Sequence, residues 1–186
     1  MYEFDSNEEK YFSWYLDELT KRGILLKWGY HPKPFSLSDR TVRVYNKILK
    51  TKTIIKDSVI LNKHEYQADF LLYWNPEWID KFFMNLDEPV NHKDSPFIAQ
   101  GGLNFSVIDV KGTFAGPRNN SAITFPLNMK WVYQKYSIYV QKIIPDKLFA
   151  ETFTPARYLF TDVSGKPRKI KFRVRMLNKY IDEINE

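Results

Sequence analysis

The stretch Leu103-Asn-Phe-Ser-Val-Ile-Asp-Val-Lys111 decides the fold and the candidate chemistry of this chain. It is rich in β-branched and aromatic residues, which predicts a central strand, and Gly112 ends it. Because successive side chains of a strand point to opposite faces, Asp109 and Lys111 share one face. Charges in such apolar surroundings are costly unless they pair or bind a metal ion. The stretch therefore indicates a functional carboxylate beside a lysine.

A second apolar stretch, Tyr66-Gln-Ala-Asp-Phe-Leu-Leu-Tyr-Trp74, carries Asp69 and predicts another central strand. Two carboxylates that converge from neighbouring strands suit a hard cation such as Mg²⁺, which keeps several waters and takes further ligands from phosphate. We expect Mn²⁺ to substitute for it. A lysine beside such a site can hold a water molecule or stabilise charge that develops on phosphate. Asp69, Asp109 and Lys111 are thus the candidate core of an active site.

The remaining sequence predicts an α/β fold with a mixed β-sheet core flanked by helices, an extra β-hairpin and a β-rich C-terminal tail. Periodicity and stop signals predict helices over residues 7–22, 77–85, 128–136 and 178–185. Extended segments are expected over residues 24–35, 41–48, 53–61, 137–144 and 169–176, with the second and third paired as the hairpin. The length favours a single domain, residues 1–186, with a core over about 4–145 and an extension over 146–186.

Composition narrows the classes of site and partner. The chain of 186 residues has no cysteine, which excludes disulfides, thiol nucleophiles and cysteine-based zinc sites. His31, His64 and His92 lack metal-ligand spacing, so oxygen ligands are expected for any metal. The net charge of +6 favours an anionic partner. No apolar run approaches the roughly 18 to 20 residues of a membrane helix, and no export signal opens the chain, so we expect a cytoplasmic protein with no membrane partner.

The order Glu9, Asp69, Asp109-Val110-Lys111 resembles the PD-(D/E)XK nuclease superfamily, which includes restriction enzymes and phage junction-resolving endonucleases. Asp109 and Lys111 match the (D/E)XK half, and Asp69 matches the aspartate of the PD half, with Ala68 in place of the proline. The opening Phe4-Asp-Ser-Asn-Glu-Glu9 resembles the Phe-x-Ser-x-x-Glu start of the first helix in resolvase-like and phage-encoded members. Residues 125–130 are similar to the basic helix that follows the core, so the resemblance covers about residues 4–145.

This resemblance implies a restriction-endonuclease-like fold and a Mg²⁺-dependent endonuclease that hydrolyses DNA, with junctions or branched DNA among the expected substrates. It implies that Asp69, Asp109 and the backbone carbonyl of Val110 hold the metal ion. Glu9 would complete the metal site, and Lys111 would orient the attacking water. DNA is the implied partner, and a homodimer or a protein partner is compatible with the family.

Each candidate residue also has a structural interpretation. Ser6 and Glu9 form the spacing of a capping box, in which each satisfies a free backbone donor of the other. Periodicity alone does not choose between Glu8 and Glu9, and the resemblance favours Glu9. Asp109 and Lys111 match a solvated ion pair at a strand end, and Asp69 matches a turn cap or the partner of a neighbouring lysine.

Basic residues along the chain are candidate contacts to nucleic acid. In the strand expected over residues 169–176, basic side chains share one face and apolar side chains the other. Positive side chains also protect an edge strand from pairing with other molecules. This alternative stays open for residues 169–176 and for the basic residues around the hairpin. The expected nucleic-acid-binding residues are Arg118, Lys130, Lys169, Lys171, Arg173 and Arg175.

Two other functions stay open at this point. The first is a non-catalytic nucleic-acid-binding protein, which would bind DNA in a salt-sensitive manner without cutting it. The second is a nuclease subunit of a recombination or transposition complex, which would be inactive without its partner.

Overall fold

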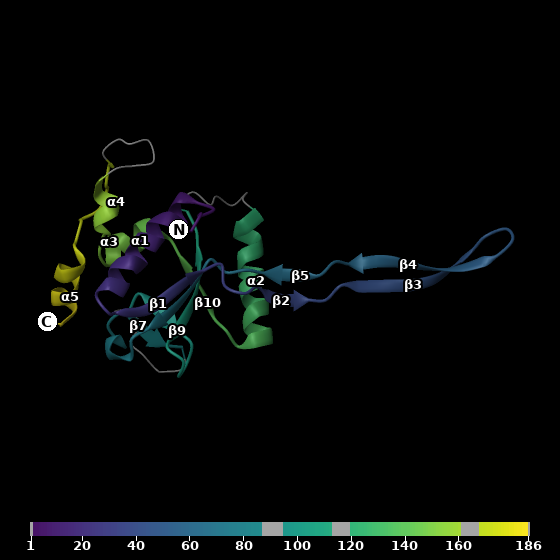
Figure 1. Cartoon of the computed structure of the whole chain (residues 1–186), viewed down its shortest axis with the longest axis horizontal. Helices are drawn as coiled ribbons and strands as arrows, with labels where there is room; N and C mark the ends of the chain where they lie inside the picture. Colours follow the sequence, from purple (N-terminus) through teal and green to yellow (C-terminus); the bar gives the residue numbers. More distant parts are fainter. Residues whose placement is uncertain (1, 87–94, 113–119, 161–167, 186) are drawn as a thin grey trace.

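The computed structural model describes residues 2–86, 95–112, 120–160 and 168–185, and their side chains except at 120–122. Its centre is a four-stranded mixed sheet in the order β1 (Leu25–Tyr30), β6 (Phe70–Trp74), β9 (Phe105–Val110) and β10 (Val140–Ile143) (Figure 1). β6 runs antiparallel to both of its neighbours, whereas β10 runs parallel to β9. The expected mixed α/β class is confirmed.

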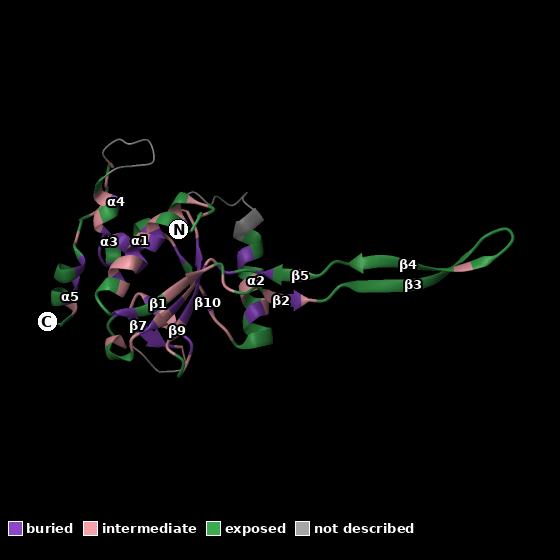
Figure 2. Cartoon of the chain, viewed as in Figure 1, coloured by how far each residue is buried: buried purple, intermediate pink, exposed green. Residues whose placement is uncertain are grey.

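Helices cover both faces of this sheet. α1 (Asn7–Lys21) packs Phe12 and Leu16 into the larger apolar cluster, which includes Phe70 and Ile108 of the sheet. α2 (Asn120–Tyr136) lies on the other face, where its buried side chains join the smaller cluster with Val107. Buried residues therefore concentrate in the sheet and on the inner sides of the two helices (Figure 2). Asp109 shares the face of Val107 because the two are separated by one residue.

α1 begins and ends where the sequence predicts. The Ser6 hydroxyl accepts a hydrogen bond from the backbone N–H of Glu9 at 3.2 Å, which caps the first turn. At the other end Gly23 adopts a positive φ of 76°, a backbone conformation that glycine allows at little cost. The predicted amphipathic helix over residues 7–22 is confirmed.

α2 begins eight residues earlier than the predicted start at residue 128, so Pro126 lies inside the helix. A proline has no N–H to donate to the preceding turn, which is why the sequence indicates a start after it. Phe125 and Val132 are buried against the sheet on either side of Pro126. Packing of this face outweighs the loss of one helical hydrogen bond.

The predicted hairpin is confirmed and is much longer than a surface turn. β2 (Phe35–Ser38) pairs with β5 (His64–Tyr66), and beyond them β3 (Thr41–Ile48) pairs with β4 (Thr53–Leu61). Figure 1 shows β3 and β4 extending well clear of the rest of the molecule. We call residues 39–63 the arm. Every residue of β3 is exposed, as is every residue of β4 except Ile54 (Figure 2).

Two predicted elements in the middle of the chain are wrong in detail. Residues 66–74 do not form one strand, because the chain leaves the β2–β5 pair at Tyr66 and joins the central sheet at Phe70. The predicted helix over residues 77–85 is instead a 3₁₀ turn, η1 (Pro76–Trp78), followed by the strand β7 (Phe83–Asn85), which pairs with β8 (Phe97–Ala99). Apolar residues at this spacing fit either element, and pairing with β8 selects the strand.

The expected β-rich C-terminal tail is wrong. After β10, the described residues form three helices, α3 (Pro145–Glu151), α4 (Ala156–Phe160) and α5 (Leu177–Asn185), and no strand. Residues 169–176 alternate between basic and apolar side chains. Ile170 and Phe172 pack against the larger apolar cluster, but no described strand lies beside this segment to pair with it. The terminal helix expected over residues 178–185 is confirmed as α5. None of the described helices is long and apolar enough to cross a membrane.

Candidate active site

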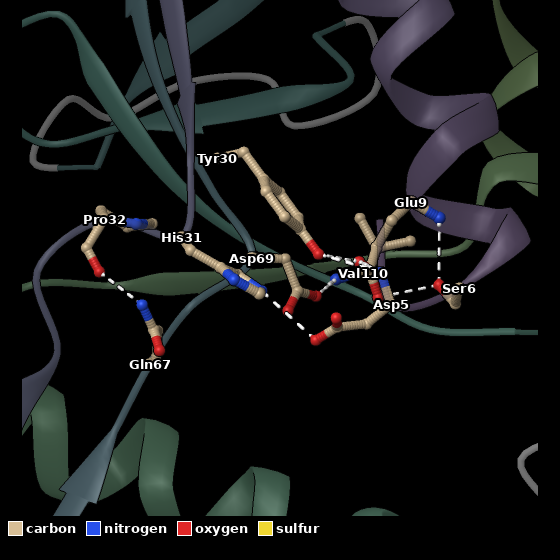
Figure 3. A network of polar contacts seen from close by, with 9 residues as sticks. All are labelled: Asp5, Ser6, Glu9, Tyr30, His31, Pro32, Gln67, Asp69 and Val110. Carbon is tan, nitrogen blue, oxygen red and sulfur yellow. Dashed lines mark hydrogen bonds and ion pairs between the residues drawn. The ribbon is translucent and has the colours of Figure 1, made fainter. Parts of the chain in front are cut away.

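The sequence-predicted residues Glu9, Asp69, Asp109, Val110 and Lys111 meet at one end of the central sheet. Asp69 directly precedes β6, and Asp109 and Val110 are the last two residues of β9. Because β6 and β9 are antiparallel, the start of the first lies beside the end of the second. The N-terminal turn of α1 brings Glu9 to the same place (Figure 3).

Asp109 is a buried carboxylate held from two sides. Its side chain comes from the sheet face that α2 covers, and the residue is only 3% exposed. The Tyr66 hydroxyl donates a hydrogen bond of 2.5 Å to Oδ2, and the Lys111 ammonium forms an ion pair with Oδ1. Apart from that ion pair, Oδ1 has no hydrogen-bond partner among the described residues. Among the described residues, only the Lys111 ammonium therefore neutralises this carboxylate oxygen of Asp109.

Tyr66 is a site residue that sequence reasoning did not identify. It ends β5, at the base of the arm, and its hydroxyl reaches Asp109 across 43 positions of sequence. Burial raises its pKa far above the usual range, and the negative charge of Asp109 adds to the effect. The hydroxyl therefore stays protonated and remains a donor to Asp109.

Lys111 connects the buried Asp109 to the surface. Its side chain is 23% exposed, against 4% for the side chain of Asp109. The Nζ atom lies 5.8 Å from the ring centre of Phe125 on α2, so a cation–π contact supplements the ion pair. The ammonium thus stands between a buried carboxylate and solvent, where it can contact an anionic ligand.

Asp69 occupies the point where the β6–β9 ladder ends. Its backbone N–H donates to the carbonyl of Ile108 at 3.0 Å, while its side-chain Oδ2 accepts from the N–H of Val110 at 2.6 Å. The carboxylate thus takes the place of the next strand carbonyl, which is a structural role different from the turn cap that the sequence left open.

This structural role does not account for the charge of Asp69. Burial and, to a smaller extent, the nearby negative charge of Asp109 raise the pKa of Asp69 from 3.8 to about 7. The N–H of Val110 and the ammonium of Lys111 oppose the rise, and Glu9 adds a smaller repulsion. Two carboxylates in this setting carry more negative charge than their protein neighbours balance, which is the electrostatic setting of a cation site.

Glu9 is a buried carboxylate with a complete set of hydrogen bonds. Its Oε2 accepts from the Tyr30 hydroxyl at 2.6 Å and from the N–H of Asp5 at 3.1 Å, and its Oε1 accepts from the Ser6 hydroxyl at 2.8 Å (Figure 3). Glu9 therefore does help to cap α1, through Asp5 and the Ser6 hydroxyl. The same carboxylate is close enough to Asp69 to raise its pKa.

Glu8 borders the site from a different direction. A methyl group at Gly112, directly after the Asp109–Lys111 segment, would come within 3.2 Å of the Glu8 carboxylate. Gly112 thus leaves room for an acidic side chain beside the end of β9. Both glutamates that the sequence left as alternatives lie near the site, and Glu9 is the one whose charge acts on Asp69.

A second acidic group lies beside this centre. One ligand atom each from Asp5, Glu9 and His31 lies within 4.8 Å of the others, and His31 Nε2 is 3.6 Å from the Asp5 carboxylate. It is the one group of three such side chains found among the described residues. The carboxylate oxygens of Asp69, Asp109 and Glu9 therefore do not all lie within 4.8 Å of one another.

His31 was expected to have no role, and its neighbourhood depends on strand register. Tyr30 pairs with Phe70, so His31 comes to lie opposite Asp69, whose carbonyl accepts from the His31 N–H at 2.9 Å. The ring of His31 stacks on Tyr30, with centroids 3.8 Å apart. Only the register of β1 against β6 reveals this proximity, and the spacing of the histidines in sequence does not. His92 lies outside the described residues.

The expected nucleic-acid-binding residues are dispersed. Lys130 is exposed on α2, whereas Arg118 lies outside the described residues. Lys169, Lys171 and Arg173 are exposed in the segment between α4 and α5, at the opposite end of the molecule from the arm (Figure 1). The basic strand face that they were expected to share does not form, because the segment is not a strand.

Arg175 is a packing residue in the structure. Its guanidinium forms an ion pair with Glu183 at 3.0 Å and donates to the carbonyls of Ala150 and Glu151. Its backbone carbonyl accepts from the N–H of Thr154 at 2.8 Å. These contacts tie the segment before α5 to the end of α3, so the side chain is engaged within the protein.

Comparison of the chain with protein-family models, with curated proteins and with solved structures finds no match. The side chains at the end of β6 and β9 therefore carry the functional information. Their oxygen donors fit a hard divalent cation, and the exposed ammonium of Lys111 beside them fits an anionic ligand.

Proposed function

We propose that the protein is a Mg²⁺-dependent endonuclease that hydrolyses phosphodiester bonds in DNA. The observation that carries this proposal is the set of charges at the end of β6 and β9. A buried Asp109 is ion-paired with a partly exposed Lys111, beside an Asp69 whose pKa is raised to about 7. Two carboxylates that can hold a metal ion and a solvent-facing ammonium that can stabilise charge on phosphate suit metal-assisted phosphodiester hydrolysis.

Within this proposal, Asp69, Asp109 and the backbone carbonyl of Val110 would hold Mg²⁺ or Mn²⁺, and Glu9 would complete the site. When bound, the ion supplies positive charge that activates water and stabilises the charge on the phosphate. Lys111 holds the attacking water or the phosphate through its ammonium group. Its ion pair with Asp109 fixes where that ammonium lies before substrate arrives.

Two tyrosines position the carboxylates. Tyr66 donates to Asp109, and Tyr30 donates to Glu9. Each hydrogen bond restricts one carboxylate oxygen, while the other oxygen of Asp109 pairs with Lys111 and the other oxygen of Glu9 accepts from Ser6. These hydroxyls neither gain nor lose a proton in the proposed reaction, since burial raises the pKa of both.

The architecture supports a restriction-endonuclease-like core as the finer fold assignment. The described chain supplies a helix, three strands of the central sheet, a second helix and a fourth strand in that order, with helices on both faces. The carboxylates lie where strands of this sheet begin and end. The net charge of +6 supports DNA as the anionic substrate.

One observation favours the non-catalytic alternative. Glu9 caps α1, Asp69 ends a strand ladder, and Asp109 is paired with Lys111, so each acidic residue also has a structural function. A protein that used them only in this way would bind DNA and leave it intact. A nuclease subunit that needs a partner would behave in the same manner until the partner is added.

The proposal is tested by digestion of plasmid, single-stranded and four-way-junction DNA with Mg²⁺ or with EDTA. We expect the wild type to cut in Mg²⁺, and the comparison of substrates to show whether branched DNA is preferred. Lys111→Ala should lose cleavage and keep its fold, whereas Lys179→Ala, an exposed lysine on α5, should cut like the wild type. Full activity of Lys111→Ala would show that the active site is not at the end of β6 and β9. Intact DNA with retarded gel mobility in the presence of every variant would support the non-catalytic DNA-binding protein.

A further inference from the structure

The arm is the most strongly charged part of the molecule. Residues 39–63 contain seven basic and two acidic residues, so they contribute +5 of the net charge of +6. The basic members are Arg40, Arg43, Lys47, Lys50, Lys52, Lys56 and Lys63. The remainder of the chain is nearly neutral, so the long-range attraction to an anion is concentrated on the arm.

The register of the arm separates two different faces. Arg43, Tyr45 and Lys47 alternate along β3 on one face, and Lys56 lies directly opposite Tyr45 on the same face. We call these four residues the basic face. The other face is mainly apolar and is likewise exposed, from 38% at Val42 to 81% at Ile48. Arg43, Lys47 and Lys56 thus share one face of the arm, and Lys50 and Lys52 follow in the turn that joins β3 to β4.

The dimensions of the arm fit a DNA duplex. A strand rises about 3.4 Å per residue, so the nine residues of β4 span about 30 Å. This length is close to the roughly 34 Å of one turn of B-DNA. A two-stranded β-ribbon also fits the major groove, which is about 12 Å wide.

The root of the arm joins it to the candidate active site. Tyr66, which ends β5, donates to Asp109, and His64 bonds Asn128 of α2 at 2.9 Å. On β2 the carbonyl of Ser36 accepts from Lys135 Nζ at 2.8 Å and from the Tyr136 hydroxyl at 2.7 Å. A duplex that rests on the arm is therefore held by an element anchored directly beside the candidate catalytic carboxylates.

We propose that the basic face of the arm binds duplex DNA outside the segment that is cut, and so holds the substrate against the active site. The choice of DNA as ligand rests on the proposed function. A second copy of the chain fits the arm less well, because two arms that each carry +5 would repel each other. Each phosphate that a basic residue neutralises steepens the salt dependence of binding by about 0.9 in the logarithmic slope.

The test is a binding titration of a 30-base-pair DNA duplex, followed by fluorescence anisotropy in EDTA between 50 and 200 mM salt. The arm variant is Arg43→Gln, Lys47→Gln and Lys56→Gln together. The control variant removes the same charge from exposed lysines of three helices, as Lys21→Gln, Lys147→Gln and Lys179→Gln. Both sets lie on exposed positions, so circular dichroism should show unchanged secondary structure.

We expect the slope of the arm variant to be shallower than that of the wild type by about 2.7, which corresponds to about a 40-fold smaller loss of affinity over this salt range. The control variant should keep most of the wild-type slope. Equal slopes for the two variants would overturn the proposal, as would a wild type that does not bind the duplex.

A second variant replaces residues 39–63 by Asn-Gly. Ser38 pairs directly with His64, so a two-residue turn can close the shortened hairpin. It should show a slope at least as shallow as that of the arm variant, because it removes all seven basic residues of the arm. If it instead kept full DNA affinity and changed the oligomeric state in gel filtration, the arm would be an interface between copies and the proposal would be wrong.

These measurements need no cleavage, so they separate this inference from the proposed function. If the arm variant has a shallower salt slope but the wild type never cuts DNA, the arm binds DNA and the proposed nuclease activity is wrong. If the wild type cuts DNA in a metal-dependent manner but the arm variant keeps the wild-type slope, the nuclease activity is supported and DNA binding by the arm is wrong.

Discussion

Replacement of Asp69 by asparagine should stabilise the metal-free protein at neutral and alkaline pH. Asparagine keeps an oxygen that accepts from the N–H of Val110, and it removes the buried negative charge beside Asp109. A substitution at a purely structural strand cap would have the opposite effect or none. The sign of the change therefore distinguishes a cation site from a structural carboxylate.

The size of the effect follows from the pKa of Asp69, which burial and Asp109 raise from 3.8 to about 7. The folded state then binds more protons than the unfolded state between these values, so the unfolding free energy falls as pH rises from about 4 to 7. At about 1.4 kcal/mol per pKa unit, the ionised carboxylate costs at most about 4 kcal/mol above pH 7. The variant should gain up to this amount at pH 8 and nothing at pH 4.

Urea unfolding followed by tryptophan fluorescence in EDTA, at several values of pH between 4 and 8, measures this difference. Asp182→Asn on α5 serves as the control for removal of an exposed carboxylate. Mg²⁺ at pH 8 should then stabilise the wild type and leave Asp69→Asn unchanged, since only the former keeps the ligand. A variant less stable than the wild type at pH 8, or a difference that does not vary with pH, would show that Asp69 is a structural carboxylate only.

Three further changes test individual contacts. Tyr66→Phe removes the hydrogen bond to Asp109 and should reduce cleavage at least tenfold, with a loss of about 1 kcal/mol in unfolding free energy, both checked on one preparation. Glu9→Gln keeps one oxygen that accepts from Asp5 and Tyr30, and its amide NH2 can donate to the Ser6 hydroxyl, so it should lose cleavage with little change in melting temperature; a large drop in melting temperature with cleavage retained would assign Glu9 to the fold alone. Arg175→Ala should destabilise the protein by about 1 to 3 kcal/mol and leave DNA affinity unaltered, and a weaker affinity with unchanged stability would return Arg175 to the DNA-binding set.

Local patterns in the sequence predict the parts of the fold that local physics determines. The cap at Ser6 and the stop at Gly23 delimit α1, and the alternation around Asp109 gives β9 and the face on which the carboxylate lies. The Asp109–Lys111 contact also follows, because residues two apart in a strand share a face. These features need no information about distant parts of the chain.

The features that were missed depend on partners that sequence does not identify. Tyr66 reaches Asp109 only because the arm returns to the sheet beside β9, and His31 meets Asp69 only through the register of β1 against β6. In the C-terminal segment the alternation of residues 169–176 is real, yet a strand requires a neighbour to pair with, and this segment lies between α4 and α5 with no described strand beside it. Periodicity reports which side chains are buried and does not report what buries them.

The most direct measurement of the central claim is cleavage of supercoiled plasmid by the wild type and by Asp109→Asn, each with Mg²⁺ and with EDTA. Asparagine preserves the shape of the side chain and an acceptor for Tyr66 while it removes the negative charge. We expect nicked or linear DNA only with the wild type in Mg²⁺. Equal cleavage by both proteins, or cleavage by the wild type that persists in EDTA, would exclude Asp109 as a ligand of a catalytic metal ion.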